Sequence, residues 1–262
     1  RRLLKYRVYD EIEESSWDGE VYDCRWVDDL RVGPDGKLYI RSRITGRRYA
    51  LEWLYGLFAG TPDTFLFRYF LSCLAEDPGL VALVLDATSA FLQSDLKEKI
   101  AVRPPKDLQK PGKLWRLWKA LPGLRKASGS WQDTIIEDVM VRRGGWVRSD
   151  HECCAVKEPV KKVKGQIHGD DMMFVGNRAA VQETREFVHS HVDCTDGGLI
   201  GLGDTEKREG RFLKKIFAVN RRLGWRYEAN RKHAQELVRR CGLEEKNAKV
   251  AATPGVKDDD LV

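Results

Sequence analysis

The segment that most constrains the fold is an uninterrupted run of six apolar residues, Leu80 to Leu85, which ends at Asp86. A strand with one solvent-exposed face alternates apolar and polar residues, whereas a strand buried on both faces is continuously apolar. The run is also far shorter than the ~20 residues that a membrane-spanning helix requires. It therefore predicts a buried strand with a carboxylate at its end.

The composition is typical of a folded, reduced protein. The chain has 262 residues, 42% hydrophobic and 33% charged, enough for one large domain or a small domain with subdomains. A formal net charge of +6 suits a partner with a phosphate backbone, although many ordinary enzymes carry as much. The six cysteines have no paired CxxC spacing, so an intracellular location, in the cytoplasm or the nucleus, is expected. No secretory signal is predicted, and the missing initial Met indicates a piece of a longer chain.

Turn signals and periodicity predict the elements before this strand. Gly33-Pro34-Asp35-Gly36 separates strand-like segments at 22–27 and 38–44, which indicates a hairpin. Thr61-Pro62-Asp63 is a start signal for a helix over Thr64–Glu76.

A second hairpin is predicted downstream, where strands at Lys164–His168 and 172–175 meet at Gly169-Asp170-Asp171. The glycines between 197 and 203 are interpreted as a turn. The remaining predicted elements are helices at 128–141, 178–191 and 233–241, and a hairpin of strands 211–219 and 223–227 around 220–222. Because strands and helices are mixed without a regular βαβ period, the predicted class is α+β.

Three carboxylates, on Asp86, Asp170 and Asp171, occupy positions that suit metal chemistry. Mg²⁺ prefers oxygen ligands and takes only a few of them from protein. Two such ions can activate a primer hydroxyl and neutralise a leaving pyrophosphate, and phosphoryl transfer asks little else beyond positioning and charge. Taken singly, each Asp has a structural alternative, because Asp is common at strand ends and turns.

The residues around these acids resemble copia-type reverse transcriptases. Leu85-Asp86-Ala87-Thr88-Ser89-Ala90-Phe91-Leu92 resembles the first catalytic motif, and Ile167-His168-Gly169-Asp170-Asp171-Met172, preceded by Ser149-Asp150, the double-aspartate hairpin. Leu121-Pro122-Gly123-Leu124-Arg125-Lys126-Ala127-Ser128-Gly129-Ser130-Trp131 is similar to the motif that positions template and nucleotide. Further similar segments are Arg25-Trp26-Val27, Asp35-Gly36, Arg41-Ser42-Arg43-Ile44, Phe212-Leu213 and Thr253-Pro254. The motifs follow the family's order over nearly the whole chain, which is more specific than any single one.

The resemblance implies a right-hand polymerase core with an antiparallel palm sheet backed by helices. Residues 1–80 would form a fingers-like region. Residues 81–227 would form the palm, with an inserted fingers segment at about 92–125. Residues 228–262 would form the end of the palm, the start of a thumb or a connection.

The resemblance also implies an RNA-directed DNA polymerase that transfers nucleotides from a dNTP to a primer 3′-hydroxyl. Asp86, Asp170 and Asp171 would be catalytic and would hold two Mg²⁺ or Mn²⁺ ions. The expected partners are an RNA/DNA primer–template duplex, a dNTP and other domains of the parent Pol polyprotein, integrase and ribonuclease H. No membrane partner is expected.

Further site residues follow from the same resemblance, each beside a structural alternative. Phe91 would exclude the 2′-hydroxyl of a ribonucleotide, or would be a core residue. Arg41 and Arg43 would bind the triphosphate, or either could be a solvated charge. Gly123 would let the backbone approach the nucleotide or template, or would end a segment. The residues expected to contact primer or template are His168, Gly169 and Phe212.

Four positions depart from the family's pattern: His168-Gly169 replaces Tyr-Val, Pro122 replaces Tyr and Ser128 replaces Pro. The acids remain in place. A catalytically decayed, nucleic-acid-binding relic of the same fold is therefore an alternative hypothesis. A two-metal nuclease and a purely structural domain are two others.

Overall fold

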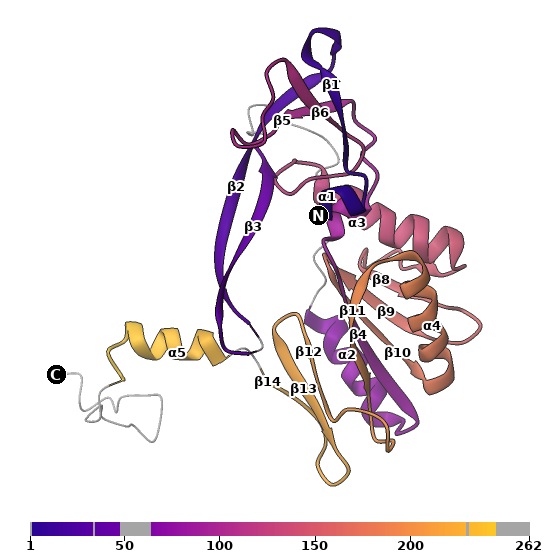
Figure 1. Ribbon diagram of the computed structural model, residues 1–262. Helices are drawn as coiled ribbons and strands as arrows, with labels where there is room; N and C mark the ends of the chain where they lie inside the picture. The colour runs from indigo at the N-terminus through magenta and orange to yellow at the C-terminus, as the bar shows by residue number, and fades with distance from the viewer. Residues whose placement is uncertain (1, 34, 48–63, 229–230, 245–262) are drawn as a thin grey trace, which may run out of the picture.

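The computed structural model describes residues 2–33, 35–47, 64–228 and 231–244, without the side chains of 64 and 231–233. The helix start signal at 61–63 and the Thr253-Pro254 motif lie outside these residues. The described residues form three sheets, with strand orders β1-β6-β5-β2-β3, β11-β4-β10-β9-β8-β7 and β12-β13-β14 (Figure 1). No helix in the described part of the chain combines the length and apolar character needed to cross a membrane.

The six-stranded sheet is antiparallel and corresponds to the expected palm sheet. Its strands are β4 (Leu80–Ala87), β7 (Val147–Arg148), β8 (Ala155–Lys157), β9 (Lys164–His168), β10 (Asp171–Asn177) and β11 (Cys194–Ile200). Four helical segments pack near it: α2 (Thr64–Glu76), α3 (Ala127–Gln132), its π-helical continuation η3 (Asp133–Arg143) and α4 (Arg178–His191).

Strand β4 lies between β10 and β11 and is covered on both faces, as its apolar run predicts. Val81, Leu83 and Leu85 face the α4-side core, defined as the buried cluster that this face forms with α3, η3 and α4. Ala82 and Val84 face the α2-side core, which the opposite face forms with α2 and the three-stranded sheet. Asp86 follows Val84 with the strand period of two, so its side chain lies on the α2 side, at the sheet edge.

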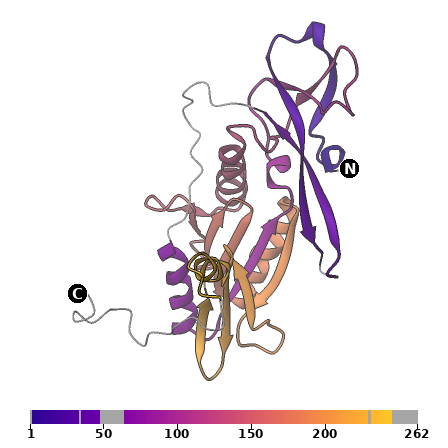
Figure 2. The same cartoon turned by 90° about the vertical axis from the view of Figure 1, so that its left-hand side faces the viewer.

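The five-stranded sheet combines two distant segments of the chain. Its strands are β1 (Tyr9–Glu13), β2 (Glu20–Val32), β3 (Leu38–Gly46), β5 (Ile100–Arg103) and β6 (Lys113–Leu117). The N-terminal segment thus pairs with the predicted inserted segment, partly through the parallel pair β2–β5. Figures 1 and 2 show this sheet above the six-stranded one, with the long β2–β3 ribbon reaching down from it.

Helix α2 was expected in the N-terminal region but packs elsewhere. Phe67, Phe70 and Leu74 are each 1% exposed and belong to the α2-side core. The helix therefore forms part of the unit built on the six-stranded sheet, because its apolar face is buried there. Short additional helices are α1 (Arg2–Lys5), η1 (Glu14–Ser16), η2 (Ala90–Gln93) and α5 (Arg231–Arg240).

The sequence predictions missed one turn and misplaced part of another. The predicted strand 211–219 is divided into β12 (Glu209–Phe212) and β13 (Lys215–Asn220), which pair across Leu213-Lys214, while β14 (Gly224–Glu228) follows as expected. Leu213 and Lys214 have φ values of 48° and 64°, a conformation that hairpin turns usually assign to Asn or Gly. Gly197 and Gly198 lie within β11, at an irregularity of its pairing with β4, whereas Gly201 and Gly203 lie in the bend that follows this strand.

Candidate active site

Asp86 and Asp171 meet on neighbouring strands. They are direct partners in the antiparallel pairing of β4 with β10. Partners in such a pair project from the same face of the sheet, with Cβ atoms about 5 Å apart. In the same row, Thr195 of β11 is opposite Asp86, and His168 of β9 is opposite Asp171. The predicted meeting of a buried strand's terminal acid with a distant hairpin is therefore confirmed.

Asp170 is brought to this pair by a two-residue turn. His168 pairs with Asp171, so Gly169 and Asp170 form the bend between β9 and β10. Gly169 has a φ of +57°, which glycine adopts with little steric cost. The carbonyl oxygen of Asp170 accepts a 2.7 Å hydrogen bond from the backbone N–H of Ala87, the residue after Asp86. The two acid-bearing segments are thus joined directly.

The acids at this site influence the pKa values of Asp86 and Asp171. Partial burial, followed by the charges of Asp170 and Asp86, raises the pKa of Asp171 to about 6, although His168 and Lys214 act in the opposite direction. Partial burial and then Asp170 raise the pKa of Asp86, while Arg41 lowers it. Like charges held together in this way disfavour ionisation.

The donor set fits hard divalent cations. Three carboxylates offer oxygen ligands at one edge of the sheet, and partial burial, followed by the charges of Asp170 and Asp86, raises the pKa of Asp171. Mg²⁺ and Mn²⁺ accept such ligands and complete their coordination with water or phosphate. Asp86, Asp170 and Asp171 are therefore candidate metal ligands, apart from a second group of possible ligands formed by Glu152, Cys153 and Cys154.

Among the basic side chains of the β2–β3 ribbon, that of Arg41 acts through its charge on Asp86. Side chains alternate along a strand, so Arg41 and Arg43 project from one face of β3, opposite the buried Ile44. Arg41 is close enough to Asp86 for its charge to lower the pKa of that carboxyl. This electrostatic contact distinguishes Arg41 as the residue of the predicted pair that lies near the site.

Phe91 and Gly123 both have structural roles. Phe91 follows the acid-bearing strand in η2, where its half-buried ring packs against both the α4-side core and the core of the five-stranded sheet. Gly123 has a φ of +85°, and a Cβ there would overlap the carbonyl oxygen of Gly46 and the methyl group of Thr45. The structure thus explains the need for glycine through the close approach of β3. Contact of either residue with a nucleotide stays a prediction.

The residues predicted to contact primer or template have different environments. His168 and Gly169 lie at the acid-bearing hairpin, and the buried Nδ1 of His168 has no hydrogen-bond partner within the described ranges. The side chain of Phe212 is 0% exposed and stacks with Phe67 in the α2-side core. The prediction that this side chain contacts the primer is therefore wrong, because no part of it reaches the surface.

Sequence reasoning missed Lys214. The tight turn between β12 and β13 exposes this residue near the acids, where its charge lowers the pKa of Asp171. The sequence did not predict the turn that carries Lys214, because neither Leu213 nor Lys214 is a typical turn residue.

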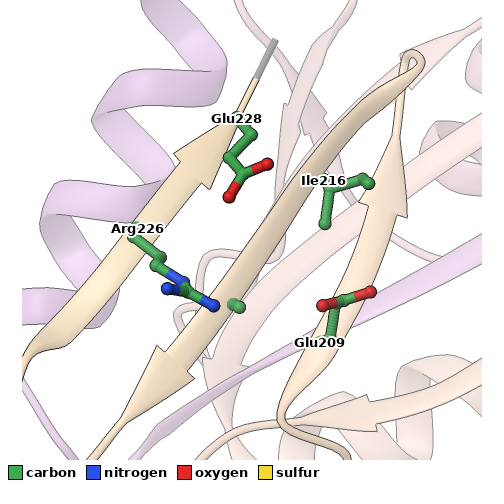
Figure 3. Close-up of a pocket in the computed structure, with 5 residues that line it drawn as sticks. Glu209, Ile216, Arg226 and Glu228 are labelled. Carbon is green, nitrogen blue, oxygen red and sulfur yellow. The ribbon is translucent and has the colours of Figure 1, made fainter. Parts of the chain in front are cut away.

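A separate cavity of about 400 Å³ lies on the three-stranded sheet (Figure 3). Glu209, Ile216, Ala218, Arg226 and Glu228 line it. None of the predicted site residues belongs to this lining, so the cavity is distinct from the carboxylate cluster.

Comparisons with known proteins agree with this geometry. Residues 66–202 match the family described as reverse transcriptase (RNA-dependent DNA polymerase). Two relatives from Saccharomyces cerevisiae are the transposon Ty1-DR4 and Ty1-DR5 Gag-Pol polyproteins. The Ty1-DR4 polyprotein is 28% identical, and the match covers 75% of this chain and 12% of the polyprotein. The Ty1-DR5 polyprotein is 42% identical, and the match covers 74% of this chain and 11% of the polyprotein. The chain therefore spans about 12% of the length of these curated relatives.

A solved structure supports the fold independently of sequence. The telomerase of Candida albicans, determined in complex with a TWJ fragment of telomeric RNA, has a TM-score of 0.52 at 7% identity. The match covers 82% of this chain and 47% of the telomerase chain. At this identity the similarity concerns the fold alone, and it agrees with the expected polymerase architecture.

Proposed function

Because this chain belongs to the reverse transcriptase (RNA-dependent DNA polymerase) family, we propose that it copies a template by transferring nucleotides from a dNTP to a primer 3′-hydroxyl. The observation that carries the proposal is the pairing of Asp86 with Asp171, beside Asp170. The three carboxylates place oxygen ligands and negative charge at one end of the palm sheet, as a cation-dependent phosphoryl transfer requires.

The reverse transcriptase family generally uses divalent metal ions. We propose that Asp86, Asp170 and Asp171 hold two ions, Mg²⁺ or Mn²⁺. When bound, such ions favour the ionised primer hydroxyl and neutralise charge on the leaving pyrophosphate. The protein contributes the placement of the three carboxylates, since strand pairing sets Asp86 opposite Asp171 and the hairpin turn brings Asp170 beside them.

The remaining residues would orient the substrates. Arg41 would bind phosphate oxygens of the incoming triphosphate, with Arg43 on the same face of β3 as a second candidate. Phe91 would restrict the space beside the sugar. His168, Gly169 and Lys214 would contact the primer strand from the β9–β10 and β12–β13 hairpins.

The expected partners are those of a reverse transcriptase within a larger polyprotein. A primer–template duplex would contact basic residues of the β2–β3 ribbon and the palm, with most affinity coming from its phosphates. Because the matched relatives are Gag-Pol polyproteins, integrase and ribonuclease H domains are proposed to accompany this domain in its parent protein. The proposed location is the cytoplasm, the nucleus or both.

Asp170→Asn tests the proposal, with Asp150→Asn as a control that removes an equal charge from an exposed site. Primer extension on an RNA template with Mg²⁺ should be abolished by the first change and retained by the second. Duplex binding should survive both. Substantial extension by Asp170→Asn would contradict the assignment of the acids.

The wild-type protein separates the alternative functions. Duplex binding without extension would favour a decayed relic. Template degradation without dNTP incorporation would favour a two-metal nuclease. An affinity for nucleic acid that does not respond to metal, together with no catalysis, would favour a structural domain.

A further inference from the structure

A buried tryptophan from a distant helix holds the tip of the acid-bearing hairpin. The indole N–H of Trp131, on α3, donates a 2.6 Å hydrogen bond to the carbonyl oxygen of Gly169. The Trp131 side chain is 1% exposed and belongs to the α4-side core. Because close-packed neighbours surround the ring, its N–H is a fixed donor.

A second hydrogen bond holds the other side of Asp170. The peptide group before Asp170 contains the Gly169 carbonyl, which Trp131 binds. The carbonyl of Asp170 itself belongs to the next peptide group, and the N–H of Ala87 binds it at 2.7 Å. Both peptide groups flanking this acid are therefore fixed from outside the hairpin, one by α3 and the other by β4.

The hairpin itself supplies little to fix this orientation. Gly169 has no side chain to pack, and a Cβ placed there would meet nothing within 4 Å. Glycine also has the widest range of backbone conformations. The direction of the Gly169 carbonyl, and with it the backbone that carries Asp170, consequently depends on the bond from Trp131.

We propose that Trp131 is a positioning residue for the catalytic acids. Its N–H sets the orientation of the Gly169–Asp170 peptide, so that the Asp170 carboxylate is directed toward the space beside Asp86 and Asp171. The inference rests on the proposed function and adds to it the group that orients one ligand. Removal of a group that orients a metal ligand typically changes metal affinity or activity by about 10- to 100-fold.

Trp131→Phe tests this role, because it removes the donor and keeps an aromatic ring. Trp146→Phe is the matched control. Trp146 is 5% exposed in the same core, where its ring packs edge-on against Phe174 with the centroids 5.6 Å apart. Both changes replace a buried indole by a phenyl ring, so they create similar packing defects.

The first measurement is the Mg²⁺ concentration that gives half-maximal primer extension. Trp131→Phe should raise it by about 10-fold or more, and Trp146→Phe should leave it near the wild-type value. Duplex affinity should be unchanged in both. A defect of packing alone would lower the melting temperature of both variants without moving the Mg²⁺ midpoint, and that result would overturn the inference.

Two further measurements do not require catalysis. Mn²⁺ binding, followed by electron paramagnetic resonance, should weaken about 10-fold in Trp131→Phe relative to Trp146→Phe. Hydrogen exchange of the Ala87 amide should accelerate in the same variant, because that amide binds the Asp170 carbonyl. If the wild type does not extend primers, the proposed function fails while these readouts still test Trp131. If the wild type extends primers normally and the two variants behave alike, the positioning role of Trp131 is refuted while the proposed function stands.

Discussion

Asp86 of β4 and Asp171 of β10 lie directly opposite each other in an antiparallel pair, with Asp170 at the adjoining turn. The pKa of Asp171 rises to about 6 through partial burial and these neighbours, and the pKa of Asp86 is also raised. The packed strands therefore hold like charges together at neutral pH. Repulsion within such a cluster lowers the stability of the metal-free protein, a trade-off that is common at sites arranged for catalysis.

Asp171→Asn should stabilise the metal-free protein at high pH. The folded-state pKa of Asp171 is about 6, above its value of about 4 in an unfolded chain. The folded state thus binds more protons between these values, so wild-type stability falls as pH rises through this window and is lowest above it. We expect a gain of about 1 kcal/mol in the free energy of unfolding at high pH, or about 2–4 °C in Tm.

Thermal unfolding with a chelator measures this effect, and the gain should disappear as pH falls toward about 4. Asp150→Asn is the control, because it removes a carboxylate from an exposed site away from the cluster. Equal gains for the two variants at every pH would show that the stabilisation reflects net charge and not the pairing of Asp171 with its neighbours.

Arg41→Gln should weaken nucleotide binding more than Arg43→Gln. Both residues project from the same face of β3, but the charge of Arg41 acts on Asp86. Loss of a charge-assisted hydrogen bond to phosphate costs about 1.5–3 kcal/mol, so the KM for dNTP should rise about 10- to 100-fold. Steady-state primer extension measures this. A larger KM effect for Arg43→Gln would reverse the assignment.

Phe91→Ala should relax the choice of sugar. The ring follows the acid-bearing strand in η2 and is held by two cores, so it can act as a fixed barrier. Removing a steric barrier of this size changes discrimination by about 10- to 100-fold, which should appear as a higher ratio of ribo- to deoxynucleotide incorporation. The ratio is internally controlled, because partial unfolding lowers both rates equally. An unchanged ratio would assign Phe91 to packing alone.

The elements that the sequence predicts well carry their signal locally. The buried strand β4 follows from its apolar run, helix α2 from the start signal directly before it, and strand β9 from the turn residues of its hairpin. These patterns are physical consequences of burial and backbone geometry. The meeting of Asp86 with the Asp170-Asp171 hairpin was expected from the family resemblance, because no local pattern pairs strands this far apart in the chain.

The rest depends on contacts between distant segments. The parallel pairing of β2 with β5 joins residues about 80 positions apart, and no periodicity encodes such a partner. The bond from Trp131 to Gly169 was equally hidden, because a buried tryptophan indicates a core and not the direction of its N–H. Phe212 was assigned from its motif, although its apolar ring is a core residue.

Lys214→Gln should reduce the electrostatic part of primer binding. Its side chain is exposed at the β12–β13 turn, close enough to the acids to lower the pKa of Asp171. If it contacts one primer phosphate, its removal should lower the slope of log affinity against log salt by about 1. Lys215→Gln is the matched control, because Lys215 extends over the ring of Phe67 at 5.1 Å. Equal slopes for the two variants would exclude a phosphate contact specific to Lys214.

Gly123→Ala should destabilise the junction between the five-stranded sheet and the following segment. The position has a φ of +85°, and a Cβ would overlap the carbonyl oxygen of Gly46. Gly112→Ala separates the two causes, because Gly112 has a φ of +69° but nothing within 4 Å of a Cβ. Backbone strain alone costs about 1–2 kcal/mol, so Gly112→Ala should lower the free energy of unfolding by that amount and Gly123→Ala by clearly more. Chemical denaturation measures both changes. Equal losses of unfolding free energy would mean that β3 shifts to accommodate the added Cβ without a free-energy cost. Glycine would then be required at position 123 for its backbone conformation alone.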